Sequence, residues 1–226
     1  NNLLPLSSLP QQTIKIRSID AGIPLENLLV SYQIASADLP RIILEKAQFS
    51  VMDGPVSLTP AVIDPSAARS NLLVHVDNID LAAFFELSQV EGLTGPGHLD
   101  GHIPIKLEGE QITISDSLLT ARAPGILRFK SDKASQLLAG AGEEMNLLLQ
   151  AIQDFHYTEL SLSLDKSAKQ DLIAKLSLLG KNPNVKAGQV FRLNIKLESN
   201  IDKLLTPIRQ GYHLSNDLLR SSFRLH

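Results

Sequence analysis

The chain contains no cysteine, few aromatic residues and no long apolar run, and each absence narrows its class. Without cysteine there are no disulfides, no thiolate metal sites and no cysteine nucleophile. Aromatic residues make up 4 % of the sequence and hydrophobic residues 43 %, so the apolar content is mainly aliphatic, and leucine dominates it. No run approaches the ~18 consecutive apolar residues of a membrane-spanning helix, and we expect no such helix here.

The charge balance excludes a further class of partner. The net charge is −3 and the sequence pI is about 6.1. Such a chain has no global positive field that would attract nucleic acid or an anionic membrane. We therefore expect no nucleic-acid partner.

The organisation of the chain predicts one domain over residues 1–226. No charge block, Ser/Gly linker or low-complexity tract divides it, and its length suffices for a sizeable core. The sequence opens at Asn1 without Met, and no signal peptide follows. We expect a piece of a larger exported protein whose signal or anchor lies upstream.

Short alternating segments predict a mainly β fold. Apolar and polar residues alternate, or apolar runs end at turn residues, in most of the chain. The expected strands are 13–19, 28–34, 42–52, 56–62, 72–76, 103–107, 111–114, 118–121 and 125–130. Helical periodicity predicts helices over 81–87, with Asp80 as N-cap, and over about 132–152, which Gly140 and Gly142 weaken. Two more helical segments are expected, after Asp202 and over 214–219.

The strongest alternation lies in segments 160–165, 172–179 and 191–198. In each, a leucine, isoleucine, alanine or phenylalanine falls on every second position, mostly between polar residues. These segments predict an antiparallel meander with one apolar and one solvated face.

The glycine-rich stretch from Gly95 to Gly101 invites comparison with a phosphate-binding loop. Such loops need a strand before the glycines and a helix N-terminus after them. Here a strand follows, and Pro96 removes an amide. We interpret the glycines as a turn or bulge at a sheet edge.

Metal and catalytic sites find little support. His98, Asp100 and His102 share one face of an extended segment, but the two histidines would stand roughly 13 Å apart at ~3.3 Å per residue. One zinc ion, with bonds of about 2.1 Å, cannot reach both. Glu143 and Glu144 are adjacent on a helix and point in different directions, and no Gly-x-Ser-x-Gly motif occurs. We expect no enzyme, no catalytic residues, no cofactor and no metal.

The apolar stripes themselves leave two interpretations open. An alternating strand usually faces an ordinary core. The alternative is a groove for aliphatic chains, because acyl tails offer no ring to stack on and no polar group to bond. The pattern alone does not choose between them.

Several ordered motifs resemble the C-terminal region of the YdbH family. The family's glycine pattern fits residues 90–104 (VEGLTGPGHLDGHIP), and its Pro-Gly motif fits residues 121–129 (ARAPGILRF). Later motifs fit residues 155–160 (FHYTEL), 179–183 (LGKNP) and the strand from Leu193 to Asn200. Residues 71–210 match best, residues 1–70 more weakly, and the tail 211–226 hardly at all.

This resemblance implies a fold and a function. YdbH-like proteins are grouped with AsmA- and TamB-like bridges, which an N-terminal helix anchors in the inner membrane of Gram-negative bacteria. They cross the periplasm as a curved, elongated antiparallel β-sheet, and we expect that sheet here with two or three helices packed on it. Its apolar groove is thought to move phospholipids to the outer membrane, where a small outer-membrane lipoprotein is the implied partner.

Three functions therefore remain as hypotheses. The first is a lipid conduit that binds phospholipid acyl chains and contacts membranes through the full-length protein. The second is an adaptor that docks the lipoprotein by β-augmentation without carrying lipid. The third, dicarboxylate transport, is disfavoured because no Arg or Lys cluster is spaced to clamp two carboxylates.

For the conduit, we predict that thirteen apolar residues line the groove. They are Ile103, Ile105, Leu107, Leu160, Leu162, Leu164, Leu172, Leu176, Leu178, Phe191, Leu193, Ile195 and Leu197.

Overall fold

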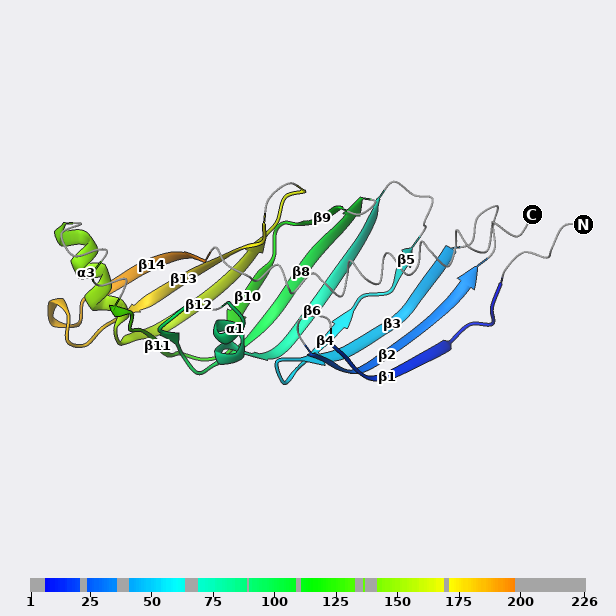
Figure 1. Cartoon of the computed structure of the whole chain (residues 1–226), viewed down its shortest axis with the longest axis horizontal. Coiled ribbons are helices and arrows are strands. Elements are labelled where there is room, and N and C mark those ends of the chain that lie inside the picture. Colours follow the sequence, from blue (N-terminus) through cyan, green and yellow to red (C-terminus); the bar gives the residue numbers. More distant parts are fainter. Residues whose placement is uncertain are drawn as a thin grey trace, which may run out of the picture.

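A computed structural model shows a long, curved, open antiparallel sheet, with two helices in the part of the chain that it describes, which confirms the predicted mainly β fold (Figure 1). The structure describes residues 7–20, 24–35, 41–63, 69–88, 90–108, 111–132, 136, 142–168 and 171–197. The helices predicted after Asp202 and over 214–219 lie outside the described residues.

Fourteen strands form the sheet. The first seven are β1 (Gln12–Asp20), β2 (Pro24–Ala35), β3 (Arg41–Val51), β4 (Gly54–Leu58), β5 (Ala61–Ile63), β6 (Ser70–Asp80) and β7 (Leu93–Thr94). The others are β8 (His98–Glu108), β9 (Gln111–Ile114), β10 (Leu118–Ala121), β11 (Gly125–Phe129), β12 (Phe155–Asp165), β13 (Ile173–Lys181) and β14 (Val190–Leu197). The helices are α1 (Leu81–Ser88) and α3 (Glu143–Ile152), with a single 3₁₀ turn at Lys186–Gly188.

Strand order in the sheet closely follows the order of the strands in the sequence. The main path runs β1-β2-β3-β4-β6-β8-β10-β12, and β13 and β14 follow from β12. Short strands branch off: β5 pairs with β3, β9 with β8, and β11 joins β12 to β7. Among the described residues, β1 pairs only with β2 and β14 only with β13, so the sheet is not closed into a barrel.

The predicted meander of the last three strands is confirmed. Leu160 of β12 lies opposite Leu178 of β13, and Leu178 lies opposite Leu193 of β14. Because side chains alternate across a strand, the aliphatic residues of all three strands share one face.

Two predicted elements differ in extent from the structure. The strand predicted over 56–62 is divided into β4 and β5 at Pro60, which has no N–H to donate to a ladder. The helix predicted from about residue 132 is described as α3 from Glu143 to Ile152. It begins after Gly142, whose φ of 102° is outside the helical region. Residues 133–135 and 137–141 lie outside the described part of the chain.

A bulge at the end of β6 delivers the chain into α1. Asn78 adopts a φ of 56°, and the register of β6 against β8 shifts between Val76 and Ile79. Asp80 follows, and its Oδ1 accepts a hydrogen bond of 2.8 Å from the Ala82 amide. This confirms Asp80 as the N-cap of the helix.

Both helices pack against the apolar cluster of the sheet. From α1, Leu81, Phe84 and Phe85 are buried, and from α3, Ala151 and Ile152. These residues belong to the same core cluster as the leucines of β12 and β13. The expectation that helices cover part of the sheet is thus confirmed for its later strands.

Candidate functional site: the apolar face of the sheet

One face of the sheet is aliphatic across nearly every main strand. Across the later strands, Leu119 of β10 pairs with Leu162 of β12 and, on its other side, with Gly101 of β8. Gly101 in turn pairs with Val76 of β6, which pairs with Val56 of β4. Alternation along each strand extends this row into a continuous surface, which we call the apolar face.

The apolar face continues through the first strands. Val56 lies opposite Phe49 of β3, and Ala47, two residues earlier on β3, lies opposite Val30 of β2. Val30 pairs with Ile14 of β1, the outermost strand described on this side.

The structure places the predicted groove residues together. All thirteen belong to β8, β12, β13 or β14, or immediately precede β13, and the pairings align them on the apolar face. Ile105, Leu107, Leu160, Leu162, Leu164, Leu172, Leu176, Leu178 and Leu193 are buried, and Ile103, Phe191 and Ile195 are partly buried. The backbone of Leu197 pairs with Ala174, but its side chain lies outside the described part. Contact of these residues with lipid stays a prediction.

The more accessible part of the apolar face lies in the first strands, which were predicted as strands but contribute no residue to the predicted groove. Ile14 and Ile16 of β1 are 44 % and 37 % exposed, whereas Leu162 and Leu178 are 0 % exposed. The alternation over 13–19 already indicated which residues of β1 share a face. Only the register of β1 against β2 shows that this face is continuous with that of the later leucines.

The opposite face is polar along the same rows. Ser161, Ser177 and Asn194 lie in one row of β12, β13 and β14. In the neighbouring row Ser163 pairs with Lys175, whose Nζ lies 2.8 Å from an Asp165 oxygen. The sheet therefore separates an aliphatic surface from a solvated one, as the meander pattern predicted.

The glycine motif has a steric role at one end of the strands. A Cβ on Gly97 would lie 2.9 Å from the Tyr157 hydroxyl oxygen, and a Cβ on Gly125 would collide with the same ring. Tyr157 is 2 % exposed, and its hydroxyl has no hydrogen-bond partner among the described residues. Burial raises the pKa of Tyr157. Close packing around one tyrosine explains these glycines without a nucleotide.

Asp100, the middle residue of the candidate set His98, Asp100 and His102, is held by an arginine and a backbone amide. Arg122, which follows β10, forms ion pairs with Asp100 and Asp77, and Asp100 also accepts a 2.7 Å hydrogen bond from the Asn78 amide. Desolvation raises the pKa of Asp100, but the bonds from Arg122 and Asn78 outweigh it and lower that pKa overall. No group of three or more metal-ligating side chains occurs in the described ranges.

This polar network fixes the bulge that leads to α1. Arg122 also donates a 2.9 Å hydrogen bond to Asn78 Oδ1, so one guanidinium connects the end of β10 to β6 and β8. The network lies beside Asn78, whose left-handed backbone geometry costs energy that the surrounding contacts offset.

Comparison with known protein families gives a match for this chain. The YdbH-like family, described as intermembrane phospholipid transport protein YdbH, has a model that matches residues 1–221. The chain belongs to this family. The match extends beyond the motifs that first indicated it and includes the first strands, where the apolar face is most accessible.

Other comparisons add no relatives. Neither the curated proteins nor the solved structures contain a match to this YdbH-like chain. Within the described residues, no helix has the length and apolarity needed to cross a membrane.

Proposed function

We propose that this chain is the C-terminal part of a periplasm-spanning bridge and that its apolar face carries phospholipid acyl tails between membranes. The role is non-catalytic, and an N-terminal helix of the full-length protein anchors the bridge in the inner membrane. Membership of a phospholipid transport family supports the substrate class. The continuous aliphatic face is the observation that carries the mechanism.

The chemistry of the face suits acyl chains. Transfer of a methylene group from water to an apolar surface is favourable by ~0.8 kcal/mol, so a tail is stabilised along its whole length without specific contacts. Such contacts are non-directional, and a tail can therefore slide from one strand to the next. Polar side chains on the other face keep the exterior of the sheet solvated.

Accessibility suggests where a tail is held in this chain. Ile14 and Ile16 expose aliphatic surface on β1, and partly buried residues such as Phe49, Leu72 and Val74 continue it. The predicted groove residues of β12 and β13 are buried in the same cluster as residues of both helices. We infer that tails bind over β1–β6 and that binding beyond β8 needs the packed residues to separate.

Native mass spectrometry with lipid extraction tests the conduit. Purified wild-type chain is expected to retain phospholipid, and the double substitution Ile14→Glu/Ile16→Glu to lose most of it, because carboxylates cannot share the site with a tail. The matched control is Lys15→Glu/Arg17→Glu, which changes the opposite face of the same strand. Equal lipid retention in both variants would contradict the conduit.

A second function is supported by the edge of β14. In the described residues β14 pairs only with β13, and Val190 at its start is 59 % exposed. An unpaired edge accepts a further strand, and a small outer-membrane lipoprotein is the proposed partner. Substitution of Asn194 by proline in the middle of β14 is expected to reduce capture of that lipoprotein while lipid retention over β1–β6 persists.

A further inference from the structure

A polar pocket lies at the end of the sheet, away from the accessible part of the apolar face. It has a volume of about 410 Å³. Its walls come from the end of β11, the end of α3 and the loop after β13. The lining residues include Arg128, Lys130, Gln153, Asp154 and Asn184.

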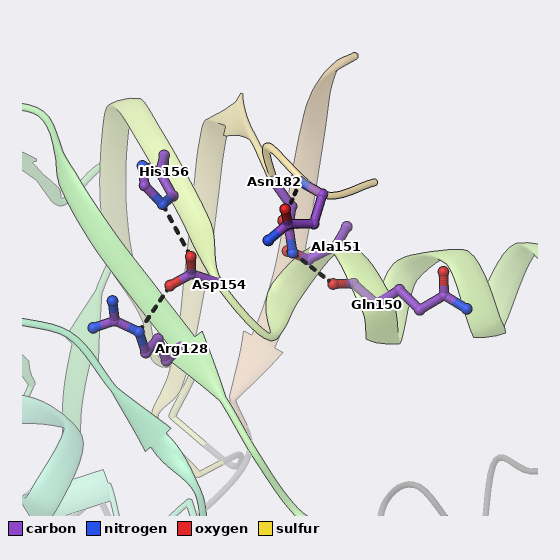
Figure 2. A network of polar contacts seen from close by, with 7 residues as sticks. Arg128, Gln150, Ala151, Asp154, His156 and Asn182 are labelled. Atoms are coloured by element: carbon purple, nitrogen blue, oxygen red, sulfur yellow. Dashed lines mark hydrogen bonds and ion pairs between the residues drawn. The ribbon is translucent and has the colours of Figure 1, made fainter. Parts of the chain in front are cut away.

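The carboxylate of Asp154 orients the guanidinium of Arg128 (Figure 2). Its Nε donates a 2.8 Å hydrogen bond to Asp154 Oδ1, and Asp154 Oδ2 lies 3.1 Å from His156 Nε2. The hydrogen bond from His156 and the charge of Arg128 lower the pKa of Asp154. Among the described residues only Nε of Arg128 is used in these contacts, so its terminal nitrogens have donors to offer an anion.

The end of α3 would ordinarily oppose an anion, because its last carbonyls carry partial negative charge. Asn182 is 4 % exposed, and its Nδ2 donates to the carbonyls of Gln150 at 2.9 Å and Ala151 at 3.4 Å (Figure 2). Its Oδ1 accepts the amide of Asn184 at 2.9 Å. These bonds occupy two of the carbonyls and order the loop that forms one wall of the pocket.

Lys130 adds a second positive charge to the pocket. It is exposed, and it makes no ion pair within the part of the chain that the structure describes. Two cations and amide side chains line a space that has ample room for a phosphate group, and their N–H groups can donate to its oxygens.

We propose that this pocket binds the phosphate of a phospholipid headgroup while that lipid is still in a bilayer. Arg128 follows Leu127, which is 0 % exposed and belongs to the core cluster, so the two side chains point to opposite sides of β11. A headgroup held by Arg128 thus belongs to a lipid whose tails are outside the apolar face. The net charge of −3 gives no long-range attraction, so this docking depends on the local pair of cations.

Co-sedimentation with vesicles tests the proposal. Wild-type chain is expected to bind phosphatidylglycerol vesicles and to ignore vesicles of digalactosyldiacylglycerol, which contain no phosphate. The variant Arg128→Gln/Lys130→Gln is expected to bind phosphatidylglycerol about tenfold more weakly or worse. The matched control, Lys15→Gln/Arg17→Gln, also removes one lysine and one arginine charge, but at the other end of the sheet. It should bind like wild type.

Two further measurements make the result decisive. Lys130→Gln alone leaves the contact of Arg128 with Asp154 intact, so a loss of binding by this variant with an unchanged melting curve supports the pocket directly. Titration with inorganic phosphate, followed by NMR, separates the sources of phosphate. Binding of free phosphate without vesicle binding would overturn the membrane assignment, as would equal weakening by the two double variants. Lipid retention in the Ile14/Ile16 experiment is measured separately and is expected to be unchanged by Lys130→Gln.

Discussion

In β1, Ile14 and Ile16 keep 44 % and 37 % of their surface exposed, whereas Leu162 and Leu178, on the same face of β12 and β13, keep 0 %. The local pattern is the same in both regions: aliphatic residues on every second position of an antiparallel strand. Leu162 and Leu178 belong to a buried cluster that also contains residues of α1 and α3, whereas Ile14 and Ile16 lie outside that cluster. One alternating pattern therefore serves as accessible surface in the first strands and as core in the last.

This difference indicates that the first and the later strands have different roles. A surface that transfers acyl tails has to stay accessible to them. The sheet as a whole has to remain folded while part of its apolar face is exposed. Burying apolar area is the main source of stability available to a cysteine-free chain. We infer that the later strands stabilise the end of the sheet and that the first strands offer the binding surface.

The largest expected effect tests the packed region. Leu162→Ala removes a fully buried side chain, and such substitutions typically lower the free energy of unfolding by ~2–5 kcal/mol. Ile14→Ala is the matched substitution on the accessible region and is expected to cost much less. Urea denaturation of both variants checks the comparison, and similar losses in the two would remove the distinction between the regions.

A smaller effect is expected at the junction of α3 with the loop after β13. Asn182→Ala deletes the hydrogen bonds to the carbonyls of Gln150 and Ala151, of which only Ala151 belongs to a buried residue. A buried group left unsatisfied costs ~1–3 kcal/mol. Hydrogen exchange at the amides of α3 should rise in this variant while exchange in β1–β3 stays as in wild type. Uniform acceleration across the sheet would contradict local anchoring.

Acid is expected to weaken the polar network of Arg122, Asp100 and Asp77 beside the bulge at the end of β6. Arg122 and the Asn78 amide hold the pKa of Asp100 in the folded chain below its ordinary value of 3.8, so its contribution to stability is fully present above that value. It is lost as the pH falls through the lowered folded pKa. In Asp100→Asn, unfolding free energy measured between about pH 5 and pH 2 should depend less steeply on pH. An unchanged slope would mean that the ion pair with Arg122 contributes nothing.

The smallest effect is expected at Tyr157. Its hydroxyl is buried without a partner among the described residues, so Tyr157→Phe removes a desolvated polar group and leaves the ring contacts with Gly97 and Gly125. Thermal unfolding should show unchanged or slightly increased stability. A clear decrease would show that the hydroxyl is hydrogen-bonded in solution.

Much of the fold could be predicted from the sequence, because alternation with period two is a direct consequence of strand geometry. The meander of β12–β14 and the cap at Asp80 are examples. The division at Pro60 and the left-handed Asn78 were missed, because each depends on how a strand meets its neighbours. Chain-distant pairs such as Leu119 with Leu162 are not visible in local patterns at all.

The candidate site was predictable only in part for the same reason. The pattern places Leu160, Leu162 and Leu164 on one face, but it does not reveal that helices pack against that face. The pocket around Arg128 joins residues from three separate segments, and no spacing in the sequence indicates it. Sequence periodicity identifies faces, whereas accessibility follows from the tertiary packing.

Photocrosslinking in cells tests the central claim most directly. A photoreactive amino acid at Ile16 of the full-length protein is expected to capture phospholipid, because that position lies on the accessible apolar face. The same probe at Arg17, on the adjacent position of the same strand, is expected to capture little. Equal capture at the two positions, or capture at neither, would contradict the account that this face carries acyl tails.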